Sequence, residues 1–146
     1  IRDVDIAWLA GIVDGEGCIY SHWVNRNRYK TGGNVCVEIR IEATSLSMIS
    51  NVAKICDASD IDYSLETRTQ PNATKPSFRI NIRRQKAVCC FLRLIIPFLV
   101  VKLKEAEAAL AWYLQWGDQR GNIAARPSLE DKIIFFEHLR ALKKTA

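Results

Sequence analysis

The chain of 146 residues has few of the residues that build metal clusters and disulfide frameworks. Its two histidines, His22 and His138, stand far apart, and none of its five cysteines forms a Cys-x-x-Cys pair. We therefore expect neither a zinc site nor a set of disulfides. Reduced thiols are the simplest interpretation, and they favour an intracellular protein. A bridge between Cys18 and Cys36 stays open as an alternative.

Long apolar segments are also missing. The longest one, 87–101, contains Arg93 and Pro97, so it is too short and too interrupted to cross a bilayer. No secretory leader is recognisable, and we expect a protein that is not secreted and has no membrane partner. With 49% hydrophobic residues, 7 glycines and 4 prolines, the composition excludes collagen, coiled coils and disorder. The length predicts a single domain over 1–146.

Hydrophobic periodicity predicts an α+β fold. We expect helices over 3–15, 45–57, 85–96, 101–115 and 128–142, and strands over 18–24, 34–43, 62–69 and 77–84. Asp3 can cap the first helix, Gly15 and Gly17 end it, and Ser128 with Asp131 resembles a capping box. Short links within each strand pair imply hairpins, hence a four-stranded antiparallel sheet with helices on one face. The last helix is expected to cover its own domain, with dimer contacts as the alternative.

The strand residues that the alternating pattern places on the face away from the core, with those in the hairpin loops, carry an excess of positive charge. The outward and loop residues between 17 and 84 carry an excess of six positive charges, more than the +5 of the whole chain. A merely solvated face is the ordinary alternative. Arg and Asn, however, pair with base edges, and β-ribbons enter the major groove. The candidate DNA contacts are Tyr20, His22, Arg26, Arg28, Lys30, Asn34, Glu38, Arg40, Glu66, Arg68, Lys75, Arg79, Asn81 and Arg83.

The sequence from Leu9 to Gly17, LAGIVDGEG, carries the most specific signal. Ala7, Gly11 and Gly15 are four residues apart and line one helix face, so a second helix can approach closely there. Glu16 follows between two glycines, at the helix end. Two copies of this helix around a two-fold axis would bring two Glu16 carboxylates together, suited to Mg²⁺ with phosphate and water. The plain alternative is a helix-end acid beside a glycine cap.

This nine-residue run closely resembles the signature of the LAGLIDADG homing endonucleases. The predicted order of elements and the segment Pro97–Lys104 are similar to that family too, so the resemblance covers about 3–116 and leaves a helical extension over 119–146. It implies a saddle-shaped sheet and a Mg²⁺-dependent, site-specific DNA endonuclease, with Mn²⁺ or Ca²⁺ as substitutes. It also implies the cytoplasm of a prokaryote or an organelle.

The resemblance assigns roles to individual residues. Glu16 and the carbonyl of Gly15 would bind metal, and Lys102, with Lys104 as the weaker candidate, would lie at the scissile phosphate. A single motif implies a homodimer on a nearly palindromic double-stranded site. Its contacts are expected at Ala7, Trp8, Gly11, Asp14 and Gly15.

One departure concerns the end of the second strand. The family often has Gln there and a basic residue a turn later, where this chain has Ala43 and Ser47. An RNA-binding splicing maturase and a DNA-binding protein without catalysis therefore remain alternatives on the same scaffold.

Overall fold

The computed structural model describes residues 1–24, 33–117 and 126–144. The elements follow in the order α1 (Asp3–Glu16), β1 (Gly17–Val24), β2 (Asn34–Ala43), α2 (Leu46–Ala58), β3 (Ser64–Arg68), β4 (Ser77–Ile82), α3 (Gln85–Ile95), the 3-10 turn η1 (Ile96–Phe98), α4 (Leu103–Trp116) and α5 (Leu129–Lys144).

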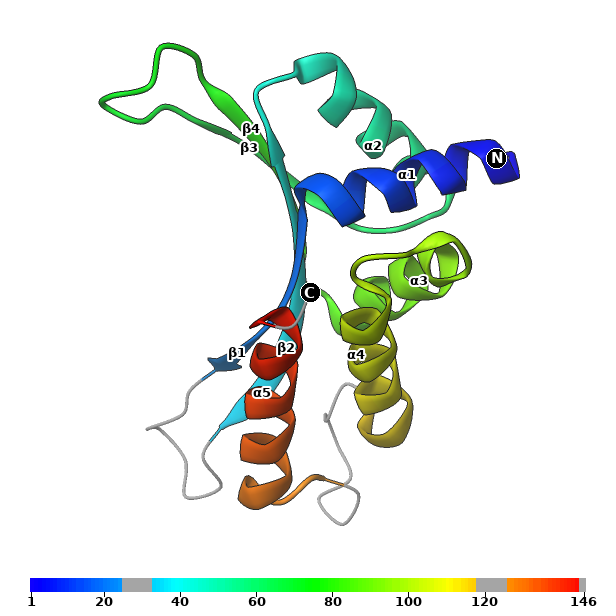
Figure 1. Ribbon diagram of the computed structural model, residues 1–146, viewed down its shortest axis with the longest axis vertical. Coiled ribbons are helices and arrows are strands. Elements are labelled where there is room, and N and C mark those ends of the chain that lie inside the picture. Colours follow the sequence, from blue (N-terminus) through cyan, green and yellow to red (C-terminus); the bar gives the residue numbers. More distant parts are fainter. Residues whose placement is uncertain (25–32, 118–125, 145–146) are drawn as a thin grey trace.

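The four strands form one antiparallel sheet in the order β1-β2-β4-β3. Helices α1 to α4 lie on one side of this curved sheet, and the opposite side is left open (Figure 1). The predicted fold class is therefore confirmed. The β1–β2 register pairs Ile19 with Ile39 and Tyr20 with Glu38, so alternate residues separate cleanly into a helix-covered face and an open face.

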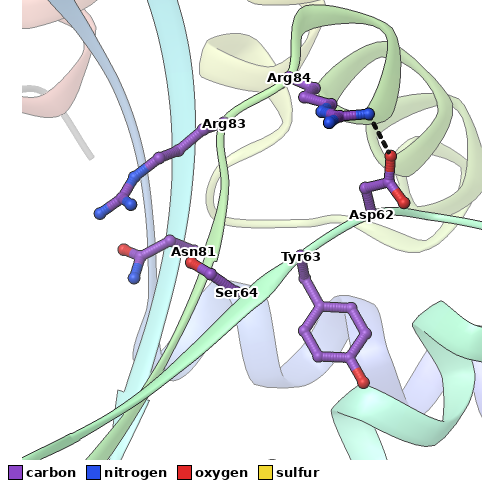
Figure 2. A pocket seen from close by; sticks show the side chains of 6 residues that line it. All are labelled: Asp62, Tyr63, Ser64, Asn81, Arg83 and Arg84. Atoms are coloured by element: carbon purple, nitrogen blue, oxygen red, sulfur yellow. Dashed lines mark hydrogen bonds and ion pairs between the residues drawn. The ribbon is translucent and has the colours of Figure 1, made fainter.

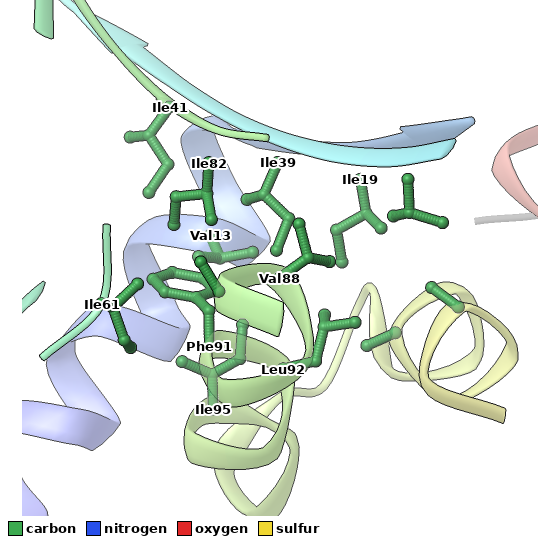
Figure 3. Close-up of a cluster of buried hydrophobic side chains, with 14 of the residues drawn as sticks. Val13, Ile19, Ile39, Ile41, Ile61, Ile82, Val88, Phe91, Leu92 and Ile95 are labelled. Atoms are coloured by element: carbon green, nitrogen blue, oxygen red, sulfur yellow. The ribbon is translucent and has the colours of Figure 1, made fainter. Parts of the chain in front are cut away.

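The core lies between the sheet and α3. Ile19, Ile39 and Ile82 of the sheet meet Phe91 and Leu92 of α3, and all five side chains are fully buried (Figure 3). The residues that α3 buries recur at spacings of three and four, which is the apolar stripe that lets a helix cover a sheet. Burial of such side chains contributes about 1.5–3 kcal/mol each, and this layer holds the open face in shape.

The helix ends agree with the predictions in part. Ser45 caps α2 by accepting a hydrogen bond from the Met48 amide, and Ser128 and Asp131 exchange the hydrogen bonds of a capping box. The Asp3 prediction was wrong, because Asp3 is already helical and Arg2 is the cap residue.

Several other boundaries also differ from expectation. β3 is shorter than 62–69, β4 ends at Ile82 rather than at 84, and α4 begins at Leu103 rather than at 101. The five cysteines, which all lie within the described residues, form no disulfide. The open bridge alternative fails because the register places Cys18 opposite Arg40 and Cys36 opposite His22, so the two thiols are not cross-strand neighbours.

Helix α5 packs on its own domain, as expected. The ring of Phe135 stacks on Trp112 of α4 at 4.4 Å, and Phe136 meets Trp23 of β1 at 5.8 Å. The buried Lys132 Nζ donates to the carbonyl of Gly33 at 2.6 Å, which ties α5 to the start of β2. Within the described residues, none of the helices is long and apolar enough to cross a membrane.

Candidate catalytic centre and nucleic-acid interface

The C-terminal end of α1 is joined to the segment before α4 by the side chain of Asp14. Its Oδ2 accepts the amide of Val100 at 2.9 Å, and its Oδ1 accepts the amides of Val101 and Lys102 at 3.1 and 2.9 Å. A carboxylate that accepts three amides satisfies donors that the start of α4 would otherwise leave to water. It thereby holds the main chain just before α4, whose first helical residue is Leu103.

Lys102 is brought to the same place. Its Nζ donates to the main-chain carbonyl of Asp14 at 2.7 Å, next to Gly15 and the exposed Glu16, the last residue of α1. The residues that the sequence named for catalysis thus come from positions more than 80 apart and meet at one helix end.

The helix end suits a hard cation. Its terminal carbonyls carry the negative end of the helix dipole, and Glu16 adds a carboxylate that forms no ion pair within the described residues. A side-chain carbon built at Gly15 would meet nothing within 4 Å, so ligands can approach closely. Across the same described residues no three His, Cys, Asp or Glu side chains gather as a metal site. One carboxylate plus phosphate and water oxygens is nevertheless a usual Mg²⁺ environment.

Gly17 has a local reason to be glycine. A Cβ there would lie 2.8 Å from the carbonyl oxygen and 2.9 Å from the Cα of Val13. Its own φ of −89° is ordinary extended backbone, so the close approach, and not the conformation, requires the missing side chain. Gly17 is therefore the true cap of α1, and Gly15 lies inside the helix.

Two charged residues near Lys102 were missed by the sequence analysis. Glu105 of α4 is only 4% exposed, and burial raises the pKa of its carboxyl although Lys143 and Lys102 lower it in part. Lys143 of α5 lies 3.3 Å from the Cys18 thiol and above the ring of Tyr20. The helical spacing of Glu105, Ala109 and Trp112 puts all three on one buried face, which is the signal that would have marked Glu105.

One stripe of α1 is left uncovered. Gly11 has nothing within 4 Å of its virtual Cβ, as at Gly15, and Val4 on the same stripe is 60% exposed. Val100 and Val101 beside Asp14 are exposed as well. Of the other expected interface residues, Ala7 is half-buried and Trp8 packs partly against the core.

The open face of the sheet carries most of the predicted DNA contacts. Tyr20 and His22 of β1, Arg40 of β2 and Arg79 of β4 are half-buried there, and Arg83 just after β4 is exposed. Glu38 and Asn81 lie on the same face but are 5% and 1% exposed. Both lie on the open face as predicted but present little surface there, and their contact with DNA stays a prediction.

Glu38 is held as a carboxylate. Burial alone would raise its pKa, but hydrogen bonds from Tyr20 and Arg83, together with the charges of Arg83 and His22, lower it. Burial and the bond to Glu38 raise the pKa of Tyr20 to about 12, so its hydroxyl stays a donor. His22 Nδ1 lies 3.7 Å from Glu38 Oε2, which is beyond hydrogen-bond distance.

Of the remaining candidates, Glu66 belongs to the same group, because it accepts hydrogen bonds from Asn81 and Arg83, and the others lie farther apart. Arg26, Arg28 and Lys30 fall outside the described residues. Asn34 is exposed at the start of β2, and Lys75 is exposed between β3 and β4. Glu66 and Arg68 are half-buried on β3. The structure thus gathers the strand residues near the middle of the sheet and leaves the others toward its ends.

A shallow pocket of about 340 Å³ lies beside this face, at the start of β3 and the end of β4. Its lining includes Asn81, Ser64, Arg83 and Arg84 (Figure 2). Arg83 and Arg84 point in opposite directions, and Arg84 pairs with Asp62 at 3.2 Å. Only Arg83 therefore belongs to the open face.

No family model matches the chain, and no curated protein sequence matches it either. Solved structures do. The homing endonuclease I-CvuI, in complex with its target in the presence of Ca, aligns with a TM-score of 0.72 at 18% identity over 96% of this chain and 82% of that one. The homing endonuclease I-TnaI aligns with a TM-score of 0.62 at 17% identity, over 99% and 97%.

The LAGLIDADG homing endonuclease I-SmaMI, bound to cleaved DNA, aligns with a TM-score of 0.66 at 15% identity over 97% of this chain but 48% of its own. The chain therefore spans about half of I-SmaMI. At these identities the comparisons establish the fold: it is the fold of homing endonucleases, the family whose signature the segment Leu9–Gly17 resembles.

Proposed function

We propose that the protein is a site-specific double-strand DNA endonuclease that acts as a homodimer with a divalent metal, Mg²⁺ first. The observation that carries this proposal is that Lys102 Nζ donates to the Asp14 carbonyl, directly before Gly15 and Glu16 at the end of α1, in a chain whose sheet has an open face with several arginines. A phosphodiester cut needs a metal site, a cation for the phosphate and a surface that holds the duplex. This chain has residues suited to each.

In this mechanism the sheet binds and orients the duplex, and the two subunits each serve one strand. Glu16 and the Gly15 carbonyl would hold the metal, which supplies an activated water and stabilises the leaving oxygen. Lys102 neutralises charge on the scissile phosphate, and Asp14 positions Lys102 through its amide and Nζ. Ala43, half-buried, and Ser47, exposed, contribute no acid or base of their own.

The homodimer is supported by the uncovered stripe of α1 and by the length comparison. Gly11 and Gly15 leave open space where a second helix fits, and close helix contact at small residues is a known packing mode. This chain covers 82% of I-CvuI but only 48% of I-SmaMI. We expect this ratio if two copies of the present chain together correspond to one chain of I-SmaMI. A two-fold dimer favours a nearly palindromic target.

The test is a randomised duplex library incubated with the protein in Mg²⁺ or in EDTA, with an RNA pool in parallel. We expect double-strand cuts at a defined sequence in Mg²⁺ and none in EDTA. Retention of RNA without nicking would replace the proposal with a splicing maturase. Sequence-specific retention of DNA without nicking, in Mg²⁺ and in Mn²⁺, would replace it with a non-catalytic DNA-binding protein.

A further inference from the structure

Six side chains on the open face of the sheet form a ring of polar neighbours, five of whose six links are hydrogen bonds. The ring draws on every strand: β1 and β3 supply one residue each, β2 supplies two, and β4 with the residue just after it supplies two. In order around the ring the members are Tyr20, Arg40, Asn81, Glu66, Arg83 and Glu38. Hydrogen-bond networks of this kind fix side chains that would otherwise sample many rotamers.

One half of the ring holds Arg40. Its Nη2 donates to the Tyr20 hydroxyl at 2.9 Å, and its Nε donates to Asn81 Oδ1 at 3.4 Å. The guanidinium also lies 5.1 Å from the centre of the Tyr20 ring. Asn81 connects this half to Glu66, because its Nδ2 donates to Glu66 Oε1 at 3.2 Å.

The other half holds Arg83. Its Nε donates to Glu38 Oε1 at 2.6 Å, and its Nη2 donates to Glu66 Oε1 at 3.4 Å. Tyr20 and Glu38 are direct cross-strand partners, and burial and the nearness of Glu38 raise the pKa of Tyr20, so these two side chains complete the ring. Both arginines therefore have Nε and Nη2 engaged by buried or half-buried neighbours.

A guanidinium has five N–H donors, so each arginine keeps three for a partner outside the protein. A free arginine loses rotamer entropy when it binds in one conformation, and here the neighbouring side chains already hold Arg40 and Arg83 in place. The remaining N–H donors of a guanidinium lie in one plane, and two of them can bond the O6 and N7 acceptors of guanine in the major groove. Glu38 and Asn81, in contrast, are covered and have no free edge to offer a base.

We propose that Arg40 and Arg83 read guanines in each half-site, and that Glu38, Asn81 and Glu66 are positioning residues that do not contact DNA. This inference rests on the proposed DNA-binding function and divides the predicted contacts into readers and supports. It also explains why acids lie on a face meant for phosphates. These acids weaken the electrostatic attraction to the DNA phosphates, but they orient the two arginines toward the bases.

The experiment is a selection of bound duplexes from a randomised library, in Ca²⁺ to prevent cutting, followed by sequencing. The wild-type protein is compared with Arg40→Lys, Arg83→Lys, Glu38→Gln and Glu66→Gln. Asp62→Asn is the matched control, because it makes the same carboxylate-to-amide change in an exposed pair with Arg84, outside the ring. Thermal unfolding confirms that each variant is folded, and the partly exposed Glu66 provides a second support variant that does not disturb a buried site.

We expect two guanines in each wild-type half-site, one lost in Arg40→Lys and the other in Arg83→Lys. Glu38→Gln and Glu66→Gln should lower the guanine preference about tenfold or more, since a bidentate pair gives about 1–3 kcal/mol of discrimination. Their retention of unrelated DNA should stay equal or rise, because a negative charge is removed. Asp62→Asn should select the wild-type sequence.

Two results overturn the inference in different ways. If the wild-type protein selects a motif and folded Glu38→Gln and Glu66→Gln select it equally well, the ring does not position the readers. The inference also fails if the DNA sequence selected by the wild-type protein has no guanine at the positions where the Arg40→Lys or Arg83→Lys variant changes the selection. If the wild-type protein retains no duplex at all, the proposed function fails and this inference fails with it.

Discussion

Asp14 and Lys102 contact each other twice, although 88 positions separate them. The Asp14 carboxylate accepts the Lys102 amide, and the Lys102 ammonium group donates to the Asp14 carbonyl at 2.7 Å. A single residue of α1 thus sets both the main chain and the side chain of the lysine assigned to the phosphate. The aspartate of the motif therefore has a positioning role within its own chain, in addition to the interface role that the sequence predicts and that stays a prediction.

Asp14→Asn should destabilise the protein by about 1–3 kcal/mol. The amide keeps one acceptor oxygen but presents an NH₂ group to main-chain amides, and charged hydrogen bonds contribute about 1.5–3 kcal/mol each. Urea unfolding at neutral pH measures the change. Asp57→Asn is the control, because that exposed carboxylate accepts a single hydroxyl bond from Tyr63 at 3.2 Å. Equal midpoints for Asp14→Asn and wild type would refute the positioning role.

Two glycines of the motif should respond in opposite ways. Gly17→Ala places a Cβ against the Val13 backbone at 2.8 Å, and overpacking of this kind costs about 1–3 kcal/mol. A Cβ at position 11 meets nothing within 4 Å in one subunit, and Gly11→Leu also replaces a poor helix former.

Urea unfolding and sedimentation together separate the two effects. Gly17→Ala should lower the unfolding midpoint and remain a dimer once folded. Gly11→Leu should keep a stable subunit but sediment as a monomer. A Gly11→Leu protein that stays dimeric would mean that α1 helices do not pair across this stripe.

Glu38 should make the free energy of unfolding depend on pH in the acidic range. Its folded pKa lies below the 4.5 of an unperturbed glutamate. A lowered carboxyl pKa stabilises the fold at pH values above the unfolded pKa, and this contribution is lost as the pH falls through the folded pKa. Glu38→Gln should therefore be less stable than wild type by about 1–3 kcal/mol at pH 7. The difference in stability between the two proteins should shrink as the pH drops below 4.5. Urea unfolding midpoints of both proteins, measured from pH 7 to pH 3, test this. A difference independent of pH would show that Glu38 is not held ionised by its neighbours.

Alternation and helical periodicity were enough to predict the element order, the two hairpins and the faces of the sheet, but not that β2 pairs with β4. They could not predict burial on the open face. Alternation says that Asn81 points away from the core, but its burial beside Arg40 and Glu66, which hydrogen-bond it, depends on register across the sheet. The Asp14 contacts were equally out of reach, because nothing local in LAGIVDGEG indicates a partner near Lys102.

The catalytic roles of Glu16 and Lys102 came from the resemblance of the motif to the homing endonucleases and stay predictions. The structure adds the contact between Lys102 and the Asp14 carbonyl, two residues before Glu16. Glu105 lay within reach of pattern analysis only as a buried acid on a helix face. The effect of Lys102 and Lys143 on its carboxyl could not be predicted, because it depends on the packing of α5 against α4 through contacts such as the Trp112–Phe135 stack.

The most direct test of the central claim is Glu16→Gln on the duplex that the wild-type protein selects. Cleavage rate in Mg²⁺ and affinity in Ca²⁺ are measured together. The account predicts that cleavage falls about a thousandfold or more, since the metal loses its only side-chain carboxylate from each subunit and with it several kcal/mol of charge stabilisation. Affinity should stay within a fewfold, because the sheet and not Glu16 holds the duplex. Cleavage by Glu16→Gln at the wild-type rate would contradict the account.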